Sequence, residues 1–251
     1  MSGAGSAEAP WSGRVVLVTG SSSGIGAAVA RRFGSLGASI LVNSSRSVEA
    51  GRAVADSLPD ALYIQADVAD EAQCSMLVEN ALARWGRLDV LVNNAGTGPV
   101  IPHQNLSDAT LDVWREVFAV NVFGVWALTV AAAPALAETK GSIVNVTSLA
   151  GVRQGGSSLP YATSKAATNH MTELVARVLG PDVRVNAIAP GLVDTPRTAS
   201  WEGSFEQYAQ VAPMHRAATA DDVAEVVLFL AESPYLTGEI LVLDGGFGLV
   251  R

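Results

Sequence analysis

Short runs of valine, isoleucine and leucine alternate with helical patterns along nearly the whole chain. Most of these runs are continuous and lack a polar residue at every second position, which is typical of strands buried on both faces. Strands that alternate with helices in this way are joined by right-handed crossovers and lie parallel to one another. We therefore predict an α/β fold with a doubly wound, seven-stranded parallel sheet and helices on both faces.

The predicted elements follow one another without an internal repeat or a low-complexity linker. The strands are Arg14–Thr19, Ser39–Asn43, Leu62–Ala66, Leu88–Asn93, Ser142–Thr147, Val183–Ile188 and Ile240–Leu243. The helices are Gly24–Leu36, Ser47–Leu58, Asp70–Trp85, Asp108–Glu138, Tyr161–Leu179 and Ala220–Glu232.

Residues 192–216 form the one long segment without a clear period. A loop of this length inside a compact domain is usually functional. It contains the aromatic residues Trp201, Phe205 and Tyr208, so we predict a substrate loop that acts as a lid. A disordered surface excursion is the weaker alternative.

Composition and charge narrow the class of protein. The 251 residues suit one large α/β domain, and 49% hydrophobic residues supply a sizeable core, which excludes a disordered or coiled-coil chain. The formal net charge of −8 argues against nucleic acid or an anionic membrane surface as a partner. No run approaches the roughly 18 apolar residues that a membrane span requires.

The N-terminal residues 1–10 lack the basic and apolar regions of a secretory signal. We predict a flexible leader there, followed by a single domain over residues 11–251. The sole cysteine, Cys74, excludes an intrachain disulfide and favours a reducing, cytoplasmic setting.

A glycine-rich turn, TGSSSGIG at Thr19–Gly26, joins the first strand to the first helix. Glycines let a backbone turn sharply and approach a pyrophosphate, while the helix N-terminus offers N–H groups and a positive dipole. The spacing differs from the strict G-x-G-x-x-G fingerprint, so a plain tight turn is the alternative. Its place after the first strand of an α/β pattern favours nucleotide binding.

The second strand ends in Asn43-Ser44-Ser45-Arg46. An acidic residue here would accept from the 2′-hydroxyl of NAD, whereas two hydroxyls and a guanidinium can donate to the 2′-phosphate of NADP. This favours NADPH over NADH, and an ordinary polar loop is the alternative.

Two further strand ends carry polar or small residues. Asp67-Val68 follows the third strand and could contact an adenine amino group, although Asp67 reads equally well as a helix cap. Asn93-Asn94-Ala95-Gly96 follows the fourth strand, where small residues would let a loop lie along the cofactor. A simple turn is the alternative at this second position.

The fifth strand leads to Ser148, and Tyr161 follows thirteen positions later, with Lys165 one helical turn beyond it. A phenol has an ordinary pKa of about 10, and a nearby ammonium lowers the pKa towards the working range of an acid–base catalyst. Ser148 could hydrogen-bond the reacting carbonyl. A plain surface pair is the alternative for Tyr161 and Lys165, but the strand-terminal serine argues against it.

Asn121 interrupts the apolar helical segment Phe118–Val130. A buried amide needs hydrogen-bond partners, and it could hold a water in a proton relay. The default for this residue taken alone is a satisfied structural amide or a helix distortion beside Gly124.

Together these motifs resemble the short-chain dehydrogenase/reductase family in its compact, single-domain branch. The resemblance runs from about Trp11 to Phe247. It rests on TGSSSGIG, NNAG, Asn121, Ser148, YATSK at Tyr161–Lys165, Pro190-Gly191 and the closing GEILVLDGG. It implies a Rossmann-like fold and NAD(P)-dependent hydride transfer between the nicotinamide and a ketone or secondary alcohol.

The resemblance also implies roles for single residues. Tyr161 would be the general acid in reduction, Lys165 would lower the pKa of that phenol and hold the nicotinamide ribose, Ser148 would orient the carbonyl and Asn121 would hold the relay water. The implied cofactor contacts are Gly20, Ser22, Ser23, Gly24, Ile25 and Gly26 at the diphosphate, Ser44, Ser45 and Arg46 at the 2′-phosphate, Asp67 and Val68 at the adenine, Asn93, Ala95 and Gly96 along the cofactor, and Pro190, Gly191, Val193 and Thr195 beside the nicotinamide. No metal ligands are assigned.

One position departs from the family pattern. NADPH-dependent relatives often carry a basic residue directly before the second glycine of the motif, where this chain has Ser23. Arg46 is then the main support for NADPH. Members of this branch are usually homotetramers built from the two long central helices and the last strand, here Asp108–Glu138, Tyr161–Leu179 and Ile240–Leu243.

The substrate lining expected from the resemblance comprises Val100, Arg153, Gln154, Leu159, Leu192, Trp201 and Phe205. Such a lining suits a bulky ketone at least as well as the 3-oxoacyl thioester of an acyl carrier protein, for which Arg153 and Arg197 would be the docking cations. The alternatives are an NAD-dependent alcohol or steroid dehydrogenase in the oxidative direction, a nucleotide-sugar epimerase or dehydratase, and a non-catalytic dinucleotide-binding protein.

Overall fold

The computed structural model describes residues 9–250, apart from the side chain of Glu202. The first eight residues of the predicted leader lie outside this range. The seven predicted strands form one parallel sheet in the order β3-β2-β1-β4-β5-β6-β9. They are β1 Val15–Val18, β2 Ser39–Ser44, β3 Ala61–Gln65, β4 Val90–Asn93, β5 Ser142–Val146, β6 Arg184–Pro190 and β9 Ile240–Leu243. The predicted fold class is confirmed.

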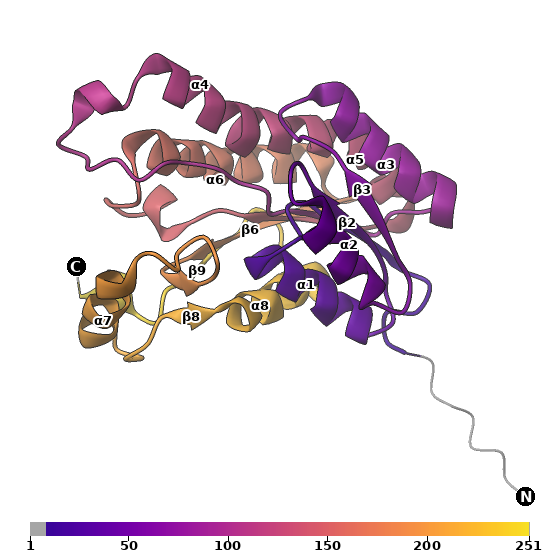
Figure 1. Cartoon of the computed structure of the whole chain (residues 1–251). Helices are drawn as coiled ribbons and strands as arrows, with labels where there is room; N and C mark the ends of the chain where they lie inside the picture. The colour runs from indigo at the N-terminus through magenta and orange to yellow at the C-terminus, as the bar shows by residue number, and fades with distance from the viewer. Residues whose placement is uncertain (1–8, 251) are drawn as a thin grey trace, which may run out of the picture.

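Helices cover both faces of the sheet (Figure 1). One face carries α1 Gly24–Ser35, α2 Val48–Asp56 and α8 Ala220–Glu232, and the other carries α3 Glu71–Trp85, α5 Val125–Thr139 and α6 Leu159–Leu179. Alternate residues of β1 face opposite layers, since Val16 and Val18 belong to the first core and Val15 and Leu17 to the second.

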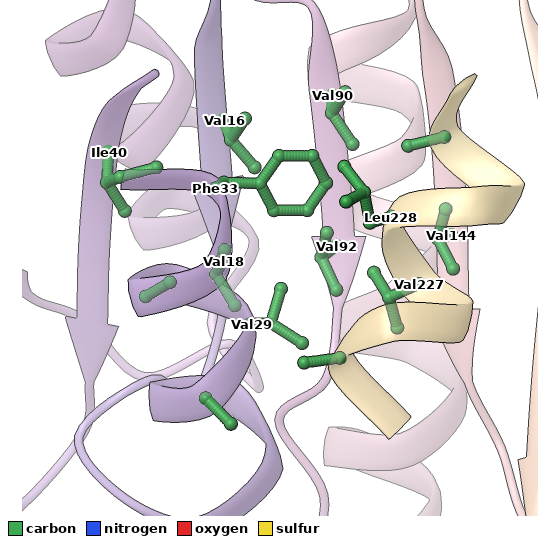
Figure 2. Close-up of a cluster of buried hydrophobic side chains, with 14 of the residues drawn as sticks. Val16, Val18, Val29, Phe33, Ile40, Val90, Val92, Val144, Val227 and Leu228 are labelled. Carbon is green, nitrogen blue, oxygen red and sulfur yellow. The ribbon is translucent and has the colours of Figure 1, made fainter. Parts of the chain in front are cut away.

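The first core joins the glycine-loop helix to the last helix. Phe33 and Val29 of α1 lie against Val90 and Val92 of β4, and Val227 and Leu228 of α8 close the cluster from the side (Figure 2). Burial of such side chains contributes about 1.5–3 kcal/mol each to folding. This packing fixes the position of α1, and the N-terminal end of α1 borders the cleft described below.

The order of the strands creates a switch point. The chain moves outward from β1 to β2 and β3, then returns to β4 on the other side of β1 and continues to β9. The loops that follow β1 and β4 therefore diverge and leave a crevice at the carboxyl ends of the strands, where doubly wound folds bind ligands.

The predicted helix Asp108–Glu138 is present as one helical run, Leu111–Thr139, and it contains the distortion beside Gly124 that was the alternative reading of Asn121. The structure has a 3₁₀ turn at Leu106–Asp108, then α4 Leu111–Phe118, a π-helical segment Ala119–Gly124, and α5. A β-carbon at Gly124 would lie 2.5 Å from the carbonyl oxygen of Val68. This close approach of the helix to the turn after β3 accompanies the extra residue of the π-helical turn.

Two expectations need correction: that residues 192–216 form a loop without regular structure, and that no run is long and apolar enough for a membrane span. The segment 192–216 contains the short strand β7 Val193–Asp194 and the helix α7 Glu202–Val211, and β7 pairs with β8 Ala218–Thr219. Among the described residues, Leu111–Thr139 is also a 29-residue helical run apolar enough to cross a membrane by length and composition alone. The core helices of globular proteins pass the same test, so the run is weak support for a membrane span.

Candidate active site

A large cleft lies at the carboxyl ends of the strands β1 to β6, with a volume of about 1250 Å³. Pockets for drug-sized molecules measure roughly 300–1,000 Å³, so this cleft can hold a dinucleotide together with a second ligand. Its walls come from the loops that the sequence motifs predicted, together with the first part of segment 192–216 and the C-terminal turn.

The loop after β1 forms a cradle for a diphosphate. Gly20 and Gly24 have φ angles of 62° and 53°, in the left-handed region that favours glycine. Ser23 is the N-cap of α1 with an extended backbone, and its side chain makes no capping hydrogen bond. The first N–H groups of α1 are therefore not capped by that side chain, and Ser22, Gly24 and Ile25 line the cleft at this end of the helix. These features fit the diphosphate of a dinucleotide.

Two of the predicted cofactor residues do not line the cleft. A β-carbon at Gly26 would lie 2.5 Å from both the Asn94 amide nitrogen and the Gly20 carbonyl oxygen, so this glycine allows α1 to meet the next loop. Asn93 is buried, and its amide donates to Asn145 Oδ1 at 2.9 Å. Both residues support the cleft from behind rather than contact a ligand.

The neighbouring Asn94 takes the place predicted for Asn93. It lines the cleft, and its Nδ2 donates to the carbonyl oxygens of Thr19 at 2.8 Å and Gly20 at 3.1 Å. Thr19 Oγ1 in turn accepts from the backbone N–H groups of Asn94 and Ala95, both at 3.0 Å. The loops after β1 and β4 are thus fixed to each other at the switch point.

At the adenosine end, the cleft is lined by Ser44, Ser45, Arg46, Asp67 and Val68, as predicted. Ser44 is nevertheless buried, and its hydroxyl is bound to Tyr63 Oη at 2.9 Å and the Ser47 carbonyl at 3.1 Å. The predicted contact of Ser44 with a phosphate therefore needs correction, because its one proton is already donated within the protein.

Asp67 is not the cap of α3, which was the alternative to a cofactor contact. Asp70 is the N-cap and accepts from the N–H groups of Ala72 and Gln73. Hydrogen bonds to Gln73 hold the pKa of the Asp70 carboxyl below its ordinary value. Asp67 instead accepts from the Ala69 N–H at 3.0 Å and lines the cleft.

Ser148, Tyr161 and Lys165 come together in one part of the cleft. Ser148 follows β5 and opens a 3₁₀ turn, where its Oγ accepts from the Ala150 N–H at 3.2 Å. Tyr161 lies in the first turn of α6, which begins after the N-cap Ser158 and contains Pro160 at its start. The Lys165 ammonium lies 5.7 Å from the centroid of the Tyr161 ring.

Lys165 is the most deeply buried cation of the site. Its Nζ donates to the Val146 carbonyl at 2.9 Å, at the end of β5. Burial, and secondarily the charge of Arg197, lower the pKa of Lys165 from 10.5 to about 7. The ammonium can therefore exchange a proton near neutral pH, which suits a group placed beside an acid–base phenol.

Asn121 lies in the π-helical segment behind the cleft and is fully buried. Its Oδ1 accepts from the Thr97 N–H at 2.8 Å, and its Nδ2 donates to the Thr97 carbonyl at 2.8 Å and to Ser164 Oγ at 2.9 Å. Both amide hydrogens are thus used within the protein, as the structural alternative for this residue predicts. The amide holds the loop after β4 against α6, and the predicted contact of Asn121 with a relay water stays a prediction.

The predicted substrate lining is only partly brought together. Arg153, Gln154, Leu192 and Trp201 line the cleft, as do the nicotinamide-side residues Pro190, Gly191, Val193 and Thr195. Val100, Leu159 and Phe205 are not among the lining residues, and Val100 is 64% exposed. Val100 lies in the outer loop after β4, Leu159 opens α6 and Phe205 lies on α7, so none of them faces the cleft.

The C-terminal turn contributes a wall that the sequence patterns did not reveal. Phe247 and Gly248 line the cleft, and the Phe247 ring stacks on Tyr208 of α7 with centroids 4.4 Å apart. Tyr208 also donates to the Asp244 carbonyl at 2.6 Å. The apolar, glycine-rich ending GGFGLV is the sequence feature of this segment, and it does not by itself indicate a wall of the cleft.

The fold and the site define an oxidoreductase that binds a nicotinamide dinucleotide. Residues 20–248 match a family model described as enoyl-(acyl carrier protein) reductase. The chain belongs to the short-chain dehydrogenase/reductase family, and the predicted reaction class, NAD(P)-dependent reduction of a carbonyl group, is confirmed.

Three relatives illustrate the similarity. A Streptomyces violaceoruber protein assigned as ketoacyl reductase 2 of the granaticin polyketide synthase is 51% identical, over 94% of this chain and 96% of the relative. The 3-oxoacyl-[acyl-carrier-protein] reductase of Thermotoga maritima is 37% identical, over 93% and 97%. A short-chain dehydrogenase/reductase structure from Burkholderia xenovorans has a TM-score of 0.88 and 38% identity, over 94% and 98%.

Proposed function

We propose that this protein uses NADPH to reduce the ketone of a 3-oxoacyl thioester or of a bulky substrate derived from one. The observation that carries the proposal is the convergence of Ser148, Tyr161 and Lys165 beside a glycine cradle in one cleft. The names of the polyketide and 3-oxoacyl reductases among its relatives support the substrate class.

Each of these three side chains has a distinct part in the proposed reaction. The bound nicotinamide supplies the hydride. Tyr161 donates a proton to the carbonyl oxygen, and Ser148 donates a hydrogen bond to the same oxygen. Lys165, held by the Val146 carbonyl, lies against the ring of Tyr161 and favours the phenolate that remains after the proton has left.

NADPH is proposed over NADH because of the chemistry at the end of β2. Ser45 and Arg46 are exposed at the edge of the cleft, and no carboxylate occurs in the segment Asn43–Arg46. In the described part of the chain, no ion pair occupies the Arg46 guanidinium. A 2′-phosphate would meet a free cation there rather than a repelling charge.

A homotetramer is proposed from the exposed apolar side chains. Phe123, Trp126 and Val130 are more than half exposed on the π-helical segment and α5, and Leu174 and Val178 are exposed on α6. Large exposed apolar side chains that recur at helical spacing support an interaction face on these elements. These elements are the long central helices through which members of this branch are expected to assemble.

The proposed function is tested by steady-state rates with an acetoacetyl thioester and a bulky aryl ketone, each with NADPH and with NADH. Turnover of the thioester with NADPH preferred is the expected result. Turnover of the aryl ketone alone would point to a general carbonyl reductase. A preference for NADH would contradict the cofactor proposal, and preferential oxidation of alcohols with NAD would favour the oxidative dehydrogenase.

A further inference from the structure

Arg197 is a charged side chain in the cleft to which the proposed reaction gives no role. It follows the nicotinamide-side residues Thr195 and Pro196. Its guanidinium extends to the opposite wall, where Nη1 donates to the Gly96 carbonyl at 2.9 Å and Nη2 to the Gly98 carbonyl at 3.3 Å. The two hydrogen bonds hold a cation across the mouth of the site.

The guanidinium lies directly beside the proposed proton donor. Arg197 Cζ is 5.2 Å from the centroid of the Tyr161 ring, a little closer than the 5.7 Å of the Lys165 ammonium. The ring of Tyr161 therefore has two cations next to it. Lys165 is buried and bound to the end of β5, whereas Arg197 is exposed and approaches from the other wall of the cleft.

The partners of Arg197 leave it able to bind a ligand. Both are neutral main-chain carbonyls, and in the part of the chain that the structure describes no carboxylate pairs with it. A guanidinium has five N–H groups, and these two contacts use only part of the fork. A bond from such a cation to a ligand oxygen is charge-assisted and stronger than a neutral one.

We propose that Arg197 binds a second oxygen of the substrate, two carbons from the reacting ketone, and so selects 3-oxoacyl compounds and other 1,3-dicarbonyls over simple ketones. The inference rests on the proposed function. When the ketone oxygen meets Tyr161 and Ser148, the second oxygen of a 1,3-dicarbonyl lies a short distance away, and the Arg197 fork is held beside the same ring. A simple ketone has no oxygen there.

The test compares Arg197→Met and Arg197→Lys with the unmodified protein. For each, kcat/KM is measured with NADPH for an acetoacetyl thioester and for an aryl ketone that has one carbonyl group. Arg197→Met is expected to lower the ratio of the two kcat/KM values, thioester over aryl ketone, about 10- to 100-fold, the range for loss of a charge-assisted hydrogen bond. Arg197→Lys should restore part of the ratio, since it keeps the charge but not the fork.

Arg52→Met is the matched control, because Arg52 is an exposed arginine on α2 that does not line the cleft. A near-equal fall in kcat/KM for both substrates would overturn the inference. It would indicate that Arg197 only positions Tyr161. A raised KM for NADPH with an unchanged ratio of the two kcat/KM values would also overturn the inference. It would indicate that Arg197 contacts the cofactor.

The unmodified protein separates this inference from the proposed function. If it reduces neither substrate, the proposed function fails. If it reduces the aryl ketone but not the thioester, the protein is still a carbonyl reductase. The inference is then overturned, because Arg197 does not favour 3-oxoacyl compounds.

Discussion

At the scale of single residues, Tyr161 is the side chain on which the proposed chemistry depends most. Tyr161→Phe removes the proton donor and leaves the ring between Gly98, Lys165 and Arg197. General acid catalysis contributes roughly 10²- to 10⁴-fold, so kcat should fall by at least about 100-fold. NADPH affinity, measured by fluorescence titration, should stay within a few-fold. Tyr235→Phe at a fully exposed position is the control, and a Tyr161→Phe variant with most of its activity would contradict the role.

Arg46 is predicted to distinguish the two cofactors. Arg46→Ala should weaken NADPH binding roughly 10- to 150-fold, which corresponds to about 1.5–3 kcal/mol for a hydrogen bond to a charged group. NADH binding should change little, since NADH lacks the 2′-phosphate. Calorimetric titration of both cofactors measures the difference, with Arg52→Ala on α2 as the control. An equal loss for the two cofactors would show that Arg46 does not bind the phosphate.

Lys165 gives a prediction about pH and stability. Its pKa is lowered to about 7 by burial, whereas the unfolded value is near 10.5. Between these values the unfolded chain binds more protons than the folded one, so the free energy of unfolding contributed by Lys165 rises with pH across this window. Urea unfolding at several pH values between 6.5 and 10 should show this rise relative to Lys165→Met. Lys140→Met, at an exposed lysine, should not change the pH dependence in this way, and a pH-independent difference for Lys165→Met would contradict the prediction.

Sequence reasoning at this scale succeeded where chemistry follows directly from position at a strand end. Ser148, Tyr161 and Lys165 line one cleft because Ser148 directly follows β5 and the 3₁₀ turn Leu149–Gly151 after it packs against α6. The orientation of individual polar side chains could not be predicted. Asn93 and Asn94 are identical in type, yet only Asn94 reaches the cleft. The Ser44 hydroxyl could donate a hydrogen bond to a phosphate, but it is hydrogen-bonded to Tyr63 of β3.

At the scale of elements, the N-terminal cap of α8 is predicted to stabilise the folded protein. Thr219 Oγ1 accepts from the Asp222 N–H, and Asp222 accepts from the Thr219 N–H at 2.7 Å, while Arg216 pairs with the same carboxylate. Thr219→Ala should lower the free energy of unfolding by about 1 kcal/mol, because the cap is lost. Thr219→Ser keeps the hydroxyl and should behave like the unmodified protein in urea unfolding. Equal loss in both variants would show that the cap is not responsible.

The boundaries of most elements could be predicted, whereas the π-helical form of the distortion beside Gly124 could not. Periodicity gave every strand of the large sheet to within two residues, because buried β-rich runs are short and bounded by loops. The π-helical segment depends on contacts far away in sequence, namely Gly124 with Val68 and Asn121 with Thr97 and Ser164. The hydrophobic pattern within one segment cannot predict contacts with residues far away in the sequence.

At the scale of the whole molecule, the switch in strand order between β1 and β4 explains why motifs spread over the chain meet in one cleft. The loops after β1, β2, β4, β5 and β6 all end at the same edge of the sheet. The position of the C-terminal turn does not follow from this rule. Phe247 reaches the cleft through its stack on Tyr208, a contact between α7 and the chain end that no local pattern indicates.

The exposed face of α5 gives the last prediction. Trp126 and Val130 are 52% exposed and lie one helical turn apart on the same apolar run. If this face is an interface between copies of the chain, Trp126→Asp places a charge in it and should lower the molar mass in solution from that of a tetramer to that of a dimer or monomer. Light scattering after gel filtration measures the mass, and Leu106→Asp, at an exposed position before α4, should leave it unchanged. A monomeric unmodified protein would contradict the assembly, and its binding to lipid vesicles would instead assign the apolar face to a membrane surface.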